Sequence, residues 1–204
     1  MSVFDGISEG EGGGSGRFFG VMVGLVTDNQ DPEKLGRVRV RFPWLSDDDA
    51  SHWARVAAPM AGKGRGLFLL PEVDDEVLVA FEHGRPESAY VLGALWNGKD
   101  TPPTSNDDGK NNLRVLRSRA GHEVVLDDTD GEEQVIVRDG SGKDSVVIDM
   151  KNGRVTVTAD KELVLACTGT IKLGGDGAKI AVNGAELKIT CDAVNINNGA
   201  LEVS

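Results

Sequence analysis

Apolar residues recur in pairs, two positions apart, along the second half of this 204-residue chain. Pairs at this spacing predict short β-strands with one apolar face. Turn sequences such as DGSGKDS, KNGR and GGDGAK separate them, so each strand ends where the chain can bend. The first steps are about eleven residues long and the later ones seven to nine. The pairs are Val124/Leu126, Val135/Val137, Val146/Ile148, Val155/Val157, Leu163/Leu165, Ile171/Leu173, Ile180/Val182, Leu187/Ile189, Val194/Ile196 and Leu201/Val203.

A strand with two apolar side chains on one face is too small to hold a core of its own. A short, regular repeat of such strands is typical of a β-solenoid or a related repeat fold. Steps of seven to nine residues provide one strand and a corner, which is less chain than a single-chain coil usually needs to travel around its own core. The pattern therefore favours three identical chains wound around one axis, each supplying one wall at every step. The predicted axis residues are Val155, Val157, Leu163, Leu165, Cys167, Ile171, Leu173, Ile180, Val182, Leu187, Ile189, Cys191, Val194 and Ile196.

A different rhythm occupies residues 17–99, which hold nearly all the aromatic residues. FFGVMVGLVTD predicts an apolar strand that ends at Asp28, and RVRVRF predicts a half-buried strand with Val38, Val40 and Phe42 on one face. WARVAAPM, GLFLLP, EVLVAFEHG and AYVLGALW predict further strands between Gly, Pro or charged turns. About five strands with little helix suit a small closed barrel, which leaves no exposed sheet edge.

The chain thus divides into four regions, all of them predicted to be β-structure or irregular. Residues 1–16 are rich in Gly, Ser and acids and predict a flexible arm. Residues 17–99 predict the barrel, and residues 100–112 form a polar, Pro-containing linker. Residues 113–204 predict the trimeric repeat.

The charge balance argues against nucleic acid as a partner. The chain holds 22 basic and 33 acidic residues, a formal net charge of -11, whereas proteins that bind nucleic acid usually present a basic stripe. Arg37, Arg39 and Arg41 share one face of a predicted strand, but Phe42 has the opposite parity, and single-strand binding needs aromatic residues on the basic face. We expect these arginines to pair with acids of a neighbouring chain instead.

No targeting segment is apparent from the sequence. There is no run of about 18 apolar residues, as a transmembrane helix would need. The start, MSVFDGISEGEGGGSG, has neither a basic nor an apolar segment of a secretion signal. We therefore expect synthesis in the cytoplasm without a signal peptide, with any export following another route.

Residues that usually carry chemistry are present, but not in a catalytic pattern. His52, His83 and His122 lie far apart and pair with no nucleophile motif. GKGRG lacks the spacing of a phosphate-binding loop, and DDTDGEE lacks the alternating ligands of a calcium loop. Cys167 and Cys191 continue apolar rows and are interpreted as buried thiols, with a disulfide or a metal as the alternatives. We expect no catalytic residue, no cofactor and no metal, and hence no enzyme.

Two long stretches resemble a known domain: GLVTDNQDPEKLGRVRVRFPWL, and HWARVAAPMAGKGRGLFLLPEVDDEVLVAFEHGRPESAYVLGALWNGKDTPP. They are similar to the OB-fold domain of the phage baseplate assembly protein V family, which includes the central spikes of contractile tails and the valine-glycine repeat (VgrG-like) spikes of type VI secretion. The similarity covers about residues 17–103. It falls on the structural signature residues Asp28, Asp31, Pro32, Gly36, Arg37, Trp53, Pro71, Glu72, Asp75, Gly93 and Trp96.

The resemblance implies an all-β fold, in which a five-stranded OB-fold barrel is followed by an intertwined trimeric β-helical needle. It implies a structural spike of a contractile injection system, assembled into the baseplate of a phage tail or an extracellular particle and piercing a target envelope. Because the large hub domains and the muramidase domain of some relatives are missing, we expect a separate hub protein and no cell-wall hydrolysis. A PAAR-type tip protein is expected to contact Leu201, Val203 and Ser204. The alternative interpretation is a spike-associated carrier that recruits an effector cargo or tip protein.

Overall fold

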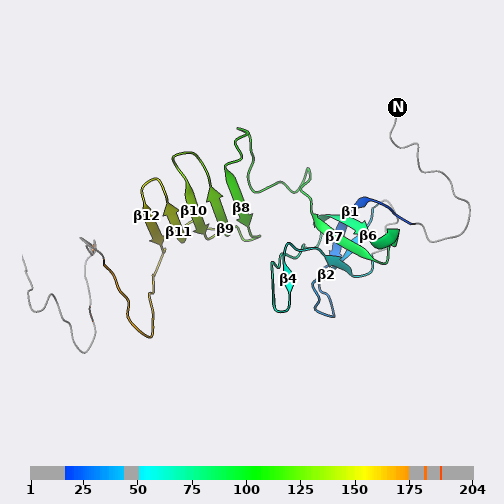
Figure 1. The fold of residues 1–204 in the computed structure, drawn as a ribbon, viewed down its shortest axis with the longest axis horizontal. Coiled ribbons are helices and arrows are strands. Elements are labelled where there is room, and N and C mark those ends of the chain that lie inside the picture. Colours follow the sequence, from blue (N-terminus) through cyan, green and yellow to red (C-terminus); the bar gives the residue numbers. More distant parts are fainter. Residues whose placement is uncertain (1–16, 44–50, 175–181, 183–188, 190–204) are drawn as a thin grey trace, which may run out of the picture.

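The computed structural model describes residues 17–43, 51–174, 182 and 189. A small barrel and a separate flat sheet follow one another along the longest axis of the molecule (Figure 1). In the described part of the chain, no helix is long and apolar enough to span a bilayer. The described fold is all-β apart from one short 3-10 helix, η1 (Glu82–Gly84).

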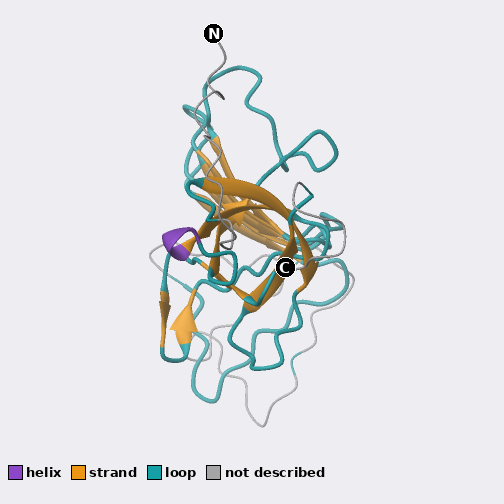
Figure 2. Cartoon of the chain, turned by 90° about the vertical axis from the view of Figure 1, so that its right-hand side faces the viewer, coloured by secondary structure: helices purple, strands orange, loops and turns teal. Residues whose placement is uncertain are grey.

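The barrel is a closed ring in the order β1-β2-β3-β7-β6. Its strands curve around a common centre when the molecule is viewed along its long axis (Figure 2). All neighbouring pairs are antiparallel except β3 and β7, which run parallel. A small hairpin of β4 (Ala61–Gly62) and β5 (Arg65–Gly66) stands outside the ring. The barrel strands are β1 (Val21–Asp28), β2 (Arg37–Arg41), β3 (Ala54–Val56), β6 (Glu76–Phe81) and β7 (Ala89–Ala94).

Alternation along the strands builds the barrel core. On β2 and β6 every second residue is buried, so valines fill the interior while arginine, glutamate and alanine face outward. Phe42 is 4% exposed and stacks at a tilt on Phe81, with 5.3 Å between the ring centroids. The predicted inward face of residues 38–42 is therefore confirmed. The fully buried side chains are Val26, Val38, Val40, Val77, Val79 and Val91.

The strand predicted for GLFLLP is wrong. Only its first residue, Gly66, belongs to a strand, and residues 67–70 are irregular with Leu67, Phe68 and Leu69 exposed. The parallel pairing of β3 with β7 closes the ring without a strand from this segment. A consecutive apolar run also lacks the alternation that would bury one side of a strand.

The second region is one antiparallel sheet whose strands pair in chain order, from β8 beside the barrel to β12 farthest from it (Figure 1). Each strand has five residues and each connection is a tight turn. The sheet begins at Leu113, at the predicted end of the linker. The strands are β8 (Leu113–Arg117), β9 (Glu123–Asp127), β10 (Gln134–Arg138), β11 (Ser145–Asp149) and β12 (Arg154–Thr158).

This sheet corrects one part of the predicted needle. The sequence pattern was interpreted as one wall per step with neighbouring strands from other chains, yet residues 113–158 pair with strands of their own chain. Each step of nine to eleven residues accommodates a five-residue strand and a turn that reverses the chain. An intertwined β-helix is thus not the structure of this part.

Beyond β12 the steps become shorter and the structure changes. Residues 159–174 form no strand, and Leu163, Leu165, Ile171 and Leu173 are exposed. Cys167 is a free, exposed thiol in this single chain, whereas a buried position was predicted. The later steps are seven to nine residues long, and the described residues after β12 pair with no strand of the same chain. Val182 and Ile189 are exposed, and the remaining predicted axis residues lie outside the described residues.

Candidate assembly surfaces

One face of the β8–β12 sheet is apolar. Its register aligns two rows that cross all five strands, because cross-strand partners point to the same face. The first row is Leu116, Val124, Val137, Val146 and Val157. The second row is Arg114, Leu126, Val135, Ile148 and Val155. We call these two rows the apolar face.

The apolar face is open in the single chain. Val146 is 40% exposed and Val155 is 65% exposed, with most of the other aliphatic members in between. By contrast, the valines inside the barrel are 0% exposed. An apolar face of this extent on an otherwise charged chain is typical of a protein–protein contact surface.

The opposite face of the sheet presents ion pairs to the solvent. Glu123 is only 9% exposed, and its carboxylate accepts a hydrogen bond from Arg138 Nε at 2.6 Å and lies 3.5 Å from Arg117 Nε. These side chains flank Val125, which is 5% exposed. The middle of the narrow apolar strip on this face, at Val125, is therefore covered within one chain, and its other members are half-buried, unlike most of those of the apolar face.

The turns of the sheet are held by aspartates that accept backbone N–H groups. Asp149 binds the side chain and backbone of Asn152, with Arg154 close by, and these hydrogen bonds lower its pKa. Asp139 accepts hydrogen bonds from the backbone N–H groups of Ser141 and Asp144, and its pKa is held well below the usual range by Ser141 first and Asp144 next. The turns are thus held by hydrogen bonds within the chain itself.

The signature turn of the barrel is built around Asp31. Its carboxylate forms a two-point ion pair with Arg37, at 2.9 Å to Nε and 2.7 Å to Nη2, and accepts N–H groups from Glu33, Leu35 and Arg37. The Arg37 guanidinium, and the backbone donors after it, hold the pKa of Asp31 well below its usual range, while Asp31 raises the pKa of Arg37. Gly36 adopts a φ of 71°, which glycine tolerates without strain. Arg37 therefore pairs within its own chain.

The neighbouring arginine has a different environment from the one predicted. Arg39 lies over the ring of Trp53, with 5.2 Å from the guanidinium carbon to the ring centroid. Such a cation–π contact occupies the guanidinium on its own chain. The expectation that Arg37 and Arg39 pair with acids of another chain is corrected for both residues.

The other signature positions also belong to turns and connections. Asp28 caps Gln30 N–H at 2.8 Å, and Asp75 caps Glu72 N–H at 2.8 Å. The carbonyl of Pro71 accepts the side-chain amide of Asn29 at 3.1 Å. The remaining positions lie in the Asp31 turn (Pro32), at an irregular step in the β6–β7 pairing (Gly93) and in an exposed connection (Trp96). These residues shape the barrel and form no common site.

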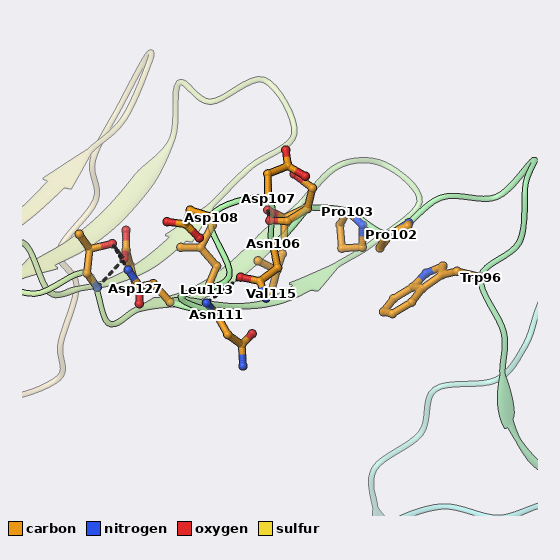
Figure 3. Close-up of a pocket in the computed structure, with 14 residues that line it drawn as sticks. Trp96, Pro102, Pro103, Asn106, Asp107, Asp108, Asn111, Leu113, Val115 and Asp127 are labelled. Atoms are coloured by element: carbon orange, nitrogen blue, oxygen red, sulfur yellow. Dashed lines mark hydrogen bonds between the residues drawn. The ribbon is translucent and has the colours of Figure 1, made fainter.

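The linker lines a shallow pocket whose side chains form no catalytic group. It has a volume of about 690 Å³ and is lined by Trp96, by linker residues and by the start of the sheet (Figure 3). Asp127, at its far end, accepts Thr129 Oγ1 at 2.6 Å and is engaged in a turn. Among the described residues no group of His, Cys, Asp and Glu side chains could hold a metal ion. The three histidines lie in separate settings, on a loop, in η1 and in a sheet turn.

A second apolar surface surrounds the β4–β5 hairpin. Phe68 is 76% exposed, and a groove of about 610 Å³ runs between it and the hairpin. The signal for this surface in the sequence is the consecutive apolar run without alternation. We call it the hairpin surface, formed by Leu35, Met60, Leu67, Phe68 and Leu69.

Residues 22–96 match the family described as the type VI secretion system/phage-baseplate injector OB domain. The match covers less than half of the chain, and it shows that the barrel is similar to this domain. The matched residues cover β1 to β7, the complete closed ring, so the resemblance seen in the sequence is confirmed for the injector OB domain.

Curated relatives of the chain are VgrG-like spike proteins. The chain is 32% identical over 130 residues to the type VI secretion system spike protein VgrG3 of Vibrio cholerae serotype O1, covering 57% of this chain and 13% of that protein. It is 33% identical over 132 residues to VgrG4b of Pseudomonas aeruginosa, covering 58% of this chain and 16% of that protein. VgrG1a of the same species is 29% identical over 126 residues, covering 56% of this chain and 20% of that protein.

The chain therefore matches less than a quarter of the length of these relatives. The matches extend beyond the injector OB domain, because 130 residues exceed the span of residues 22–96. The predicted tip-contact residues Leu201, Val203 and Ser204 lie outside the described residues, as does Cys191.

Proposed function

We propose that the chain is the homotrimeric central spike of a contractile injection system, with the injector OB domain seated toward the baseplate and the repeat region forming a needle. The observation that carries this proposal is the open apolar face directly after the barrel. A sheet with one covered face and one open apolar face needs a partner, and the repeat pattern favours two further copies of the same chain.

The energy of covering the apolar face supports assembly. An aliphatic side chain gains about 1.5 to 3 kcal/mol on full burial, so a half-exposed one gains about 1 kcal/mol when it is covered. The face holds nine aliphatic residues in each copy. Across three copies the gain is about 27 kcal/mol, which is comparable to the two association costs of about 4 to 15 kcal/mol each that a trimer incurs.

The needle would act mechanically, without catalysis. In a closed three-walled prism the strands cross the axis, and the backbone hydrogen bonds of each wall resist its lengthwise separation. The ion pairs around Glu123 would face solvent and the apolar rows would fill the axis. Beyond β12 the shorter steps favour strands that pair between copies, with Ile171 and the later axis residues inside.

The proposed partners follow from this arrangement and from the family resemblance. A separate hub protein would hold the barrel trimer, a PAAR-type tip protein would cover the far end at Leu201, Val203 and Ser204, and the target envelope would be met only during piercing. We infer no cofactor, no metal and no nucleic acid. The chain would be made in the cytoplasm and assembled into the particle.

The alternative is a carrier that recruits an effector or tip protein. The hairpin surface favours it, because Phe68 and Leu69 are exposed apolar residues beside an open groove. In this function the barrel would bind cargo and the sheet would need no second copy.

Native mass spectrometry and light scattering of the full chain separate the two functions. The spike predicts three times the 21.6 kDa mass of one chain, and a melting temperature that rises with protein concentration. A monomer at all concentrations would refute the spike and leave the carrier.

The continuation of the needle has its own test. Ile171→Asp would place three charges at the proposed axis and should weaken the trimer, while the adjacent Lys172→Asp should not. Equal heat resistance of the Ile171 variant and its parent would show that residues 159–174 lie outside the axis.

A further inference from the structure

The turns of the β8–β12 sheet form two different rims. The first rim contains the turns at residues 118–122 and 139–144, and the second contains those at 128–133 and 150–153. They lie at opposite ends of the five-residue strands, on either side of the apolar face.

Each rim is a continuous surface within one chain. In the first rim Gly140 N–H donates to His122 Nδ1 at 3.2 Å, and a Cβ at Gly140 would collide with the carbonyl oxygen of Ala120. In the second rim Met150 N–H donates to Glu133 O at 3.1 Å, and Lys151 Nζ pairs with Glu132 at 3.3 Å. The turns of each rim therefore contact one another and present a preformed edge.

The rims differ in charge. Counted with the strand residues that flank each turn and with Asp160, which pairs with Lys143 at 3.1 Å, the first rim carries three arginines, one lysine, three aspartates and one glutamate. The second carries four aspartates, two glutamates, one lysine and one arginine. The first rim is therefore neutral and the second negative, so two second rims repel one another and a first rim is the more favourable neighbour of a second.

Rotational symmetry then decides which edges meet. In a three-fold ring each contact is head to tail, so one end of every wall faces the opposite end of the next wall. A two-fold contact about an axis along the strands would instead bring like rims together. The acidic second rims disfavour that contact, whereas the ring places each of them beside a first rim.

We propose that the first rim of each copy abuts the second rim of the next copy along the three corners of the needle. This inference rests on the proposed trimer and names the surfaces that close it. Because all copies lie at one height, the 139–144 turn of one copy meets the 128–133 and 150–153 turns of its neighbour. Ser141 would then face Asp130 on one side and Asn152 on the other.

Disulfide crosslinking tests this pairing in the full chain with Cys167→Ala and Cys191→Ala. The double variant Ser141→Cys with Asp130→Cys, and a second one with Ser141→Cys and Asn152→Cys, are oxidised and run on denaturing gels. A disulfide within one chain is excluded, because the five-residue strand separates the rims by about 17 Å and a disulfide needs Cα atoms within about 7 Å. The expected product of at least one double variant is a covalent trimer, while each single cysteine variant stays monomeric on the gel.

The other outcomes overturn the proposal in distinguishable ways. A covalent dimer from a single cysteine variant would show that like rims meet in a two-fold contact. No crosslink in either double variant, with a trimeric mass in light scattering, would refute the corner pairing and leave the spike intact. A monomeric mass would refute the proposed function itself.

Discussion

The barrel and the sheet solve the same problem in opposite ways. Both are made of short strands with alternating apolar residues, yet Val79 in the barrel is 0% exposed and Ile148 in the sheet is 42% exposed. The barrel curls until its strands enclose one core, and it has no free edge. The sheet stays open, so its apolar face encloses no core within one chain. In the proposed spike this core comes from other copies of the chain.

The largest expected effect comes from a charge on the apolar face. Ile148→Asp leaves the carboxylate half-exposed in one chain but buries three of them in a trimer, at a cost of several kcal/mol each. We expect the mass in light scattering to fall from trimer to monomer while the near-ultraviolet circular dichroism of the barrel aromatics remains. Thr156→Asp, on the opposite face, is the matched control and should stay trimeric. A trimeric Ile148 variant would show that the apolar face is not the contact.

A cavity in the barrel should have a smaller and qualitatively different effect. Val79→Ala removes buried methyl groups and should lower the free energy of unfolding of the barrel by about 2 kcal/mol. Because this core belongs to one chain, we expect the loss to be independent of protein concentration and the trimer mass to be unchanged. Val23→Ala, at a residue that is 44% exposed, should cost less than about 1 kcal/mol. A loss for Val79→Ala that grows on dilution would contradict the self-contained barrel.

The sequence pattern predicted the residues of the barrel core and of the apolar face for the same physical reason. In residues 38–42 and in the pairs from Val124 to Val157, alternation fixes which side chains share a face whatever the strands pair with. Which strands pair with one another could not be predicted from this alternation, because an antiparallel meander and a wall of an intertwined helix both require it. Step length does not decide between them, because the nine-residue step from Val146 to Val155 still belongs to the hairpin repeat.

The failures of prediction have local causes. GLFLLP resembles a buried strand by composition, and only the parallel contact between β3 and β7 shows that the ring closes without it. Arg37 and Arg39 were expected to pair between chains, but Asp31 and Trp53 reach them from turns and loops whose geometry a sequence does not display. The rims could not be found from sequence either, because their identity depends on which turns lie at the same end of the strands.

Each region has a turn that is held by an aspartate with a lowered pKa: Asp31 in the barrel and Asp139 in the sheet. The stability of these turns is therefore expected to depend on pH. The pKa of Asp31 is lower in the folded than in the unfolded chain, so its stabilising contribution is present above the ordinary carboxyl pKa of about 3.9 and is lost as the pH falls. Asp31→Asn should lower the Tm near neutral pH, and this gap should shrink below about pH 4.

Glu33→Gln is the matched control for that titration. Glu33 contacts the same arginine at 3.2 Å but is 66% exposed, so its removal should change the Tm little at any pH. A Tm gap for Asp31→Asn that is unchanged at about pH 2 would show that the hydrogen bonds of the turn matter and the charge does not.

The smallest effect is expected where the two regions touch. Arg119 of the sheet pairs with Glu72 of the barrel at 2.6 Å, and the two side chains are 83% and 48% exposed. Solvent screens such a pair, so a double-mutant cycle of Arg119→Ala and Glu72→Ala should give a coupling of about 0.5 kcal/mol or less that fades in high salt. A coupling above about 2 kcal/mol would mean that barrel and sheet are stabilised as one unit, contrary to a barrel that folds on its own core and a sheet that depends on other copies.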